Sequence, residues 1–283
     1  MTTPGGTAGL EVEIGTIPTP RDPEYPEFLQ YQDGSADRAA AALPGPHAEP
    51  WLNVIAAYEP GNQPQLEQLL AHPRLGPRVR GRVLDLAAGS CWATARLSRV
   101  PAVSEVTAVD LAPAFLRTTG NRMLAACGAE RAKIRLVASS FERVPRPDAS
   151  YDAVFLIAAI HHALAPIRVL LEANRLLEPT GTLFLIEQPE LPWRLRAGRR
   201  RAIEISRATG TTEIIYTRGQ LEYLLRCGGF VVDEVLPSEG LSPRWPQRWA
   251  RKTLRALGLE SRLMKIGYVF AARPDPELAR GAR

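Results

Sequence analysis

The chain contains little cysteine. Only Cys91, Cys127 and Cys227 occur among 283 residues. An odd, scattered set without a Cys-x-x-Cys pair argues against a disulfide framework and against a cysteine zinc site. We therefore expect a reducing, cytoplasmic location.

Long apolar runs are missing as well. No stretch reaches the length that spans a bilayer. The start Met-Thr-Thr-Pro-Gly-Gly has neither the basic region nor the apolar segment of a signal peptide, so we expect none. Apolar residues make up 45% and charged residues 23%, which is ordinary for a globular protein of one elaborated domain or two small ones.

Positive charge is in modest excess, with a net charge of +5. Two arginine-rich clusters, Arg194–Arg201 and Arg244–Arg255, carry much of it. Three interpretations stand: RNA binding, membrane contact through Trp245 and Trp249, and solvated helices whose apolar sides cover a pocket. We favour the third. We thus expect neither a nucleic-acid partner nor peripheral membrane contact, and no pattern predicts an oligomeric state.

Two apolar runs that end in acids are the central feature. Asp85 lies in the first, and the small residues of Ala87–Cys91 follow it at once. Asp110 ends the second, 21 residues after Gly89. That offset is close to the roughly 20 residues at which a carboxylate binds ribose hydroxyls. The pair predicts a nucleoside-containing cofactor on an α/β sheet.

Strand and helix patterns alternate from residue 82 onward. This alternation predicts a parallel sheet covered on both faces, with ligands at the carboxyl ends of its strands. We predict a Rossmann-like α/β fold with a seven-stranded, mostly parallel sheet, a helical N-terminal cap and lid insertions. The predicted strands cover 82–86, 105–110, 134–138, 151–157, 182–186, 230–236 and 266–272.

The expected organisation has an arm and helical cap, a core interrupted by two insertions, and a loose tail. The cap covers 1–80 and the core covers 81–188 and 218–273. The lid insertion is 189–217, the basic insertion 238–265 and the tail 274–283.

The ordered motifs resemble class I S-adenosylmethionine-dependent methyltransferases of the small-molecule, type 11-like kind. The likeness runs from about Gly81 to Pro189 and resumes over Arg218–Arg273. It is carried by the turn Val83–Cys91, by Val109-Asp110-Leu111, by Ser150–Val154 leading to His161-His162, by Glu172–Leu183, and by Cys227-Gly228-Gly229-Phe230.

The resemblance implies S-adenosylmethionine as the cofactor. It assigns the following residues to it: Asp85, Ala87, Gly89, Cys91, Asp110, Leu111, Ser140, Phe141 and, closing over the site, Tyr31. Ala87 and Cys91 stand where the family has its first and third glycines, and the turn forms if neither needs a positive φ. Ser140 stands where the family often has an acid that accepts from the adenine amino group.

Methyl transfer is an in-line displacement that depends mainly on positioning, and a general base is optional. The candidate catalytic residues are His161, His162, Glu187, Glu213 and Tyr216, each with packing or capping as its alternative role. We expect no metal. The predicted acceptor is a small molecule, such as a natural product, methylated on O, N or C. The alternatives are an RNA methyltransferase, a membrane-associated lipid or quinone methyltransferase, and a nucleoside-binding protein without catalysis.

Overall fold

The computed structural model describes residues 9–22, 24–32, 53, 62–209, 211–237 and 267–277. The predicted basic insertion over 238–265 lies outside the described residues, and so does most of the predicted tail. Within the described part, none of the helices has the length and apolar character needed to cross a bilayer.

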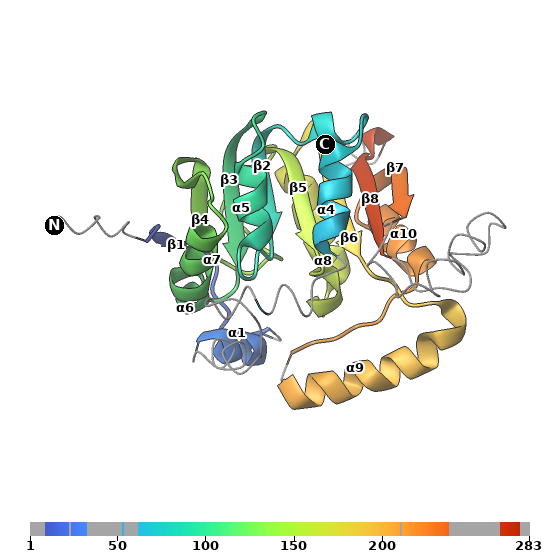
Figure 1. Ribbon diagram of the computed structural model, residues 1–283. Helices are drawn as coiled ribbons and strands as arrows, with labels where there is room; N and C mark the ends of the chain where they lie inside the picture. Colours follow the sequence, from blue (N-terminus) through green and yellow to red (C-terminus); the bar gives the residue numbers. More distant parts are fainter. Residues whose placement is uncertain are drawn as a thin grey trace.

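One eight-stranded sheet, in the order β1-β4-β3-β2-β5-β6-β8-β7, forms the centre of the molecule (Figure 1). The strands β1 to β6 run parallel, and β8 is antiparallel to both of its neighbours. All seven predicted strands are present, which confirms the Rossmann-like α/β fold. The strands are β1 (Val12–Ile14), β2 (Gly81–Leu86), β3 (Val103–Asp110), β4 (Ile134–Ala138), β5 (Tyr151–Ile157), β6 (Leu177–Glu187), β7 (Phe230–Pro237) and β8 (Tyr268–Pro274).

Two strands differ from the prediction. β1, from the predicted arm, adds an eighth strand by pairing with β4. β6 begins at Leu177 rather than at residue 182, because its first residue pairs with Tyr151 before the register shifts and Thr182 pairs with Ala153. The residues between these two pairs form an irregularity within the strand.

Helices cover both faces of the sheet. Apolar side chains of α4 (Asn62–Ala71), α5 (Trp92–Ser98) and α7 (Asn121–Ala126) pack on one face. Those of α8 (Pro166–Leu176) and α10 (Arg218–Cys227) pack on the other. Both faces are thus buried, and the carboxyl edge remains for ligands.

The sheet extends from β2 through β3 and β4 on one side, and from β5 through β6 on the other. This reversal of the strand order places a crevice at the carboxyl ends of β2 and β5. Two further helices lie along that edge: α1 (Tyr25–Gln32) near β4, and α9 (Leu195–Thr209) across the ends of β5 and β6 (Figure 1). Short helical segments lead away from the edge: α6 (Pro113–Phe115) follows β3, and η4 (Ile160–His162) follows β5.

Candidate active site

The turn after β2 has an unusual backbone. Ala87, Gly89 and Cys91 have φ values of 64°, 52° and 64°. The turn therefore forms with both non-glycine residues at positive φ, so the condition that neither needs one is not met. A left-handed conformation costs a side-chain-bearing residue roughly 1–2 kcal/mol. The turn is held nevertheless, because the Ala88 N–H donates to the Val109 carbonyl and the Cys91 N–H to the Ala88 carbonyl, both at 2.8 Å.

Asp110 connects this turn to β3. Leu86 is paired with Val109, so the next residue of β3 lies beside the turn. The Gly89 N–H donates to Asp110 Oδ2 at 2.8 Å. Burial raises the pKa of Asp110 although backbone N–H groups of Gly89, Ala112 and Leu111 oppose the shift. The structure thus brings together the two features that the sequence analysis paired.

Asp85 lies beneath the turn and is 1% exposed. Thr94 of α5 donates its hydroxyl hydrogen to Asp85 Oδ2 at 2.5 Å. Burial raises the pKa of Asp85 to about 6, and the nearby Asp110 carboxylate adds to the increase. The charged form of Asp85 is therefore costly in the unliganded protein.

A cavity of about 190 Å³, here called the cofactor cavity, opens above this turn. Of the predicted cofactor residues, Asp85, Cys91 and Ser140 are not in its lining, and the side chain of Tyr31 lies outside the described part of the chain. The lining contains Ala87, Ala88, Gly89, Ser90, Trp92, Asp110, Leu111, Phe115, Phe141, Ile157, Ala158, Ala159 and His162. Phe115 and Ala158 were not predicted, because no motif distinguishes them from core residues.

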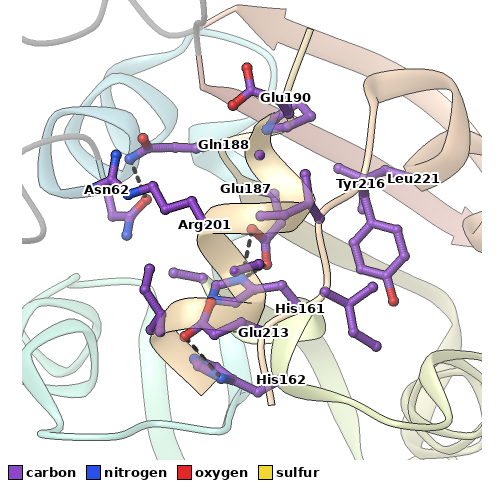
Figure 2. A pocket seen from close by; sticks show the side chains of 17 residues that line it. Asn62, His161, His162, Glu187, Gln188, Glu190, Arg201, Glu213, Tyr216 and Leu221 are labelled. Carbon is purple, nitrogen blue, oxygen red and sulfur yellow. Dashed lines mark hydrogen bonds and ion pairs between the residues drawn. The ribbon is translucent and has the colours of Figure 1, made fainter. Parts of the chain in front are cut away.

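A second cavity, here called the acceptor cavity, has a volume of about 490 Å³ (Figure 2). It lies between the ends of β5 and β6, the helix α9 and the segment 211–217. All five predicted catalytic residues are in its lining. The lining also includes Asn62, Gln188, Glu190 and Arg201, which the sequence analysis did not single out.

Hydrogen bonds across the chain assemble the acceptor cavity. The Ile214 N–H donates to the His161 carbonyl at 2.8 Å, and the Glu190 N–H donates to the Tyr216 carbonyl at 2.8 Å. Thr217 then caps α10 in a capping box with Gln220. The segment 211–217 is thereby fixed at both ends, and Glu213 is held opposite the histidines.

His161 and Glu187 form a close pair at the ends of β5 and β6. Nδ1 of His161 lies 3.2 Å from both carboxylate oxygens of Glu187, which is 6% exposed. This contact favours the tautomer that carries its proton on Nδ1, so the lone pair is on Nε2. Nε2 lies 3.9 Å from Oε2 of Glu213 (Figure 2). The arrangement matches a base with an orienting carboxylate.

His162 and Tyr216 have different surroundings. Nδ1 of His162 donates to the Thr212 carbonyl at 2.7 Å. Burial and the neighbouring His161 lower the pKa of His162 to about 4. Burial and the Glu187 carboxylate raise the pKa of Tyr216 to about 12. Both side chains are thus neutral at pH 7.

Among the described residues, one group has the composition of a metal site. One donor atom each from His161, His162 and Glu213 lies within 4.8 Å of the others. Two imidazoles and a carboxylate suit a divalent transition metal.

The two cavities share Ala158 and His162, at the end of β5. Ala158 has a φ of 50°, a further left-handed non-glycine residue. Backbone strain of this kind clusters at functional sites. Because both cavities reach Ala158 and His162, a ligand in the cofactor cavity and one in the acceptor cavity would meet at this point.

Comparison with known proteins agrees with this geometry. Residues 84–185 match the methyltransferase domain family Methyltransf_11. A malonyl-[acyl-carrier protein] O-methyltransferase of Halorhodospira halophila is 31% identical over 219 residues, 77% of this chain and 64% of that protein. A demethylmenaquinone methyltransferase of Deinococcus radiodurans is 34% identical over 123 residues, 43% of this chain and 46% of that protein. The chain thus spans less than two thirds of these curated relatives.

The matched domain over residues 84–185 and these relatives support a class I S-adenosylmethionine-dependent methyltransferase.

Solved structures of this class share its fold. Geranyl diphosphate C-methyltransferase from Streptomyces coelicolor A3(2), in complex with Mg²⁺, geranyl-S-thiolodiphosphate and S-adenosyl-L-homocysteine, has a TM-score of 0.60 at 18% identity. The match covers 91% of this methyltransferase and 100% of that chain. The 1,6-didemethyltoxoflavin-N1-methyltransferase of Burkholderia thailandensis, with S-adenosylhomocysteine, has a TM-score of 0.57 at 19% identity, with coverages of 92% and 93%. The methyltransferase domain match over residues 84–185 indicates S-adenosylmethionine as the cofactor.

Proposed function

We propose that this chain transfers the methyl group of S-adenosylmethionine to a hydroxyl group of a polar small molecule held in the acceptor cavity. The observation that carries this proposal is the meeting of the two cavities at Ala158 and His162. A methyl group that leaves the first cavity there enters the second directly. In-line transfer requires this shared boundary.

The residues around the cofactor cavity suit the ribose and the methionine part of the cofactor. Asp110 accepts from the ribose hydroxyls while keeping the Gly89 N–H, since a carboxylate has lone pairs for several donors. The backbone of the turn faces the methionine moiety. Asp85, buried below the turn, favours the methionine ammonium through its negative charge.

The acceptor cavity favours a polar acceptor. Its lining combines Glu187, Glu190 and Glu213 with two histidines and Arg201. In the proposed step the acceptor oxygen attacks the methyl carbon and the carbon–sulfur bond breaks. His161 Nε2 takes the hydroxyl proton, and Glu187 stabilises the resulting imidazolium. An apolar quinone ring fits this lining less well, which is why we place quinone methylation second.

The test compares two glycines that have the same backbone. Gly89 and Gly128 have φ values of +52° and +63°, and a Cβ on either one meets nothing within 4 Å. Only Gly89 lines the cofactor cavity. Gly89→Ala is expected to weaken the binding of S-adenosylhomocysteine at least about tenfold by calorimetry, because the methyl occupies ligand space. Gly128→Ala, with the same backbone cost, keeps the wild-type affinity.

Transfer itself is measured with methyl-labelled S-adenosylmethionine against hydroxyl, amine and quinol acceptors. Label in a hydroxyl acceptor supports the proposal, and label only in the quinol favours the second candidate. Binding of S-adenosylhomocysteine without transfer to any acceptor would favour a nucleoside-binding protein. If the Gly89 and Gly128 variants bound S-adenosylhomocysteine with equal affinity, the cofactor would not bind in this cavity.

A further inference from the structure

The N-terminal segment follows β4 to its carboxyl end. After β1 pairs with β4, the Gly15 N–H donates to the Ala138 carbonyl at 2.8 Å. The Thr16 N–H then donates to Ser139 Oγ at 3.0 Å, and the Ser140 N–H to the Thr16 carbonyl at 2.7 Å. This path brings Glu24 to the end of β4, where its carboxyl group hydrogen-bonds the Ser140 side chain.

One oxygen of Glu24 has no partner. In the part of the chain that the structure describes, Oε1 of Glu24 is the single buried side-chain polar atom without a hydrogen bond. Burial, together with the Glu142 and Asp22 carboxylates, raises the pKa of Glu24. A buried acceptor without a donor loses its hydrogen bonds to water without replacement, which costs free energy. An N–H group supplied by a ligand would recover that free energy.

The order of the strands shows which end of the cofactor lies nearby. The methionine-side turn follows β2, the ribose acceptor Asp110 ends β3, and β4 is the next strand. A nucleoside that continues in this direction places its base between the ends of β3 and β4. Leu111, Phe115 and Phe141 line the cavity there and suit a flat, apolar ring. The helix α1, which begins directly after Glu24, packs against α6, which contains Phe115.

We infer that Glu24 Oε1 accepts a hydrogen bond from the 6-amino group of adenine, and that the Ser140 hydroxyl positions this carboxylate. The inference rests on the proposed function, because it requires S-adenosylmethionine in the cofactor cavity. Ser140 Oγ accepts from the Glu142 N–H at 3.2 Å, so its own hydrogen is directed to Glu24. The N-terminal segment thus supplies a carboxylate at the end of β4.

The test exchanges the base as well as the residue. S-Adenosylhomocysteine is compared with its inosine analogue, which has a carbonyl oxygen in place of the 6-amino group. We expect the wild-type protein to prefer the adenosine ligand by roughly 10- to 100-fold, the value of a hydrogen bond to a charged group. Glu24→Gln should reduce that preference at least about tenfold, since its amide can donate to the carbonyl of inosine.

Two control variants separate recognition from structure. Glu142→Gln changes a second carboxyl group that acts electrostatically on Glu24, and it should keep the preference. Glu13→Gln removes the partner of Arg146 that anchors β1, and should weaken both ligands equally if it acts at all. Thermal melting verifies that each variant folds. If Glu24→Gln does not fold, Glu24→Asp withdraws the carboxylate by one methylene and should weaken only the adenosine ligand.

The outcomes distinguish this inference from the proposed function. A wild-type protein that binds neither ligand would overturn the proposed function. A wild-type protein that binds both equally, or a Glu24→Gln variant that keeps the full preference, would overturn the inference alone. An equal loss of both ligands in Glu24→Gln would make Glu24 an anchor of the segment rather than a contact to adenine.

Discussion

The cofactor half and the acceptor half of this site are built in different ways. In the cofactor half, Asp85 bonds a residue 9 positions away and Asp110 one 21 positions away. In the acceptor half, His161 and His162 have partners 26 and 50 positions away. The first half combines the buried Asp85 and the half-buried Asp110 with a turn between neighbouring strands. The second joins partly exposed side chains from separate segments.

This difference has a functional consequence. Donor binding depends on backbone groups and buried charges, which the fold holds in place. Acceptor binding depends on α9 and the segment 211–217, which are attached to the sheet rather than part of it (Figure 1). The acceptor half can therefore change its substrate without disturbing the donor half, as loops on a rigid scaffold do.

The largest effect is expected in the acceptor half. His161→Ala should lower kcat by about 10²- to 10³-fold, because general bases contribute on that scale. Affinity for S-adenosylhomocysteine should stay unchanged if the two halves are independent. Single-turnover transfer and calorimetry measure the two quantities. His72→Ala is the control, since this histidine interacts with Glu234 outside both cavities. A parallel loss of cofactor affinity in His161→Ala would break the comparison.

The next effect belongs to the donor half. Asp110→Ala removes the acceptor of the Gly89 N–H and the proposed acceptor of the ribose hydroxyls. We expect S-adenosylhomocysteine to bind roughly 10- to 100-fold more weakly, the value of one or two hydrogen bonds to a charged group. Asp110→Asn, which keeps an oxygen acceptor, should lose less. Unchanged affinity in the alanine variant would exclude Asp110 as the ribose contact.

The pH dependence of the free energy of unfolding tests the buried carboxyl group of Asp85 in the donor half. Its pKa is about 6 in the folded protein against an ordinary value of 3.8, so the native state binds the additional proton between these values. The free energy of unfolding should therefore fall as pH rises from about 4 to 6, by up to about 3 kcal/mol. Urea unfolding at several pH values would measure this.

Asp85→Asn provides the matched control for that pH dependence. It should show a smaller decline and be the more stable protein at pH 7, yet bind S-adenosylhomocysteine more weakly because the buried negative charge proposed to favour the ammonium is gone. Identical pH profiles for the two proteins would contradict the assignment of the ionisation to Asp85.

The sequence predicted a contact in the donor half, whereas in the acceptor half it predicted lining residues without their contacts. Asp110 and Gly89 were paired by their spacing alone, because adjacent parallel strands bring their carboxyl ends together. The positive φ of Ala87 and Cys91 was not foreseen, since the residue types argue against it and only the surrounding strands impose it. Glu24 was missed because its segment had no periodic pattern, and its place depends on the pairing of β1 with β4.

In the acceptor half, all five predicted catalytic residues line one cavity. Their mutual contacts were beyond sequence reasoning. The link from Ile214 to His161 joins an insertion to the end of β5, and no local signal encodes such a contact. Arg201 belongs to the basic helix α9, and Gln188 belongs to a loop. The composition of both segments matches ordinary solvated surface.

A smaller effect tests the strain in the donor turn. Ala87→Gly should stabilise the protein by about 1 kcal/mol, because glycine adopts φ values near 64° without a steric cost. Ala149→Gly, at a φ of 52° outside both cavities, should gain a similar amount. Chemical denaturation measures both. A destabilised Ala87→Gly would mean that its methyl group contributes more to packing than the backbone costs.

The smallest effect, none at all, is expected when metal is removed. Ligands at about 2.0–2.2 Å from one ion lie nearer to one another than the 3.9 Å between His161 Nε2 and Glu213 Oε2. Nδ1 of His162 is already committed to the Thr212 carbonyl, and Nδ1 of His161 to Glu187. Transfer by tag-free protein should therefore persist in a chelator. If the chelator abolished transfer and a divalent ion restored it, the acceptor half would act through a bound metal, and the base assigned to His161 would have to be replaced.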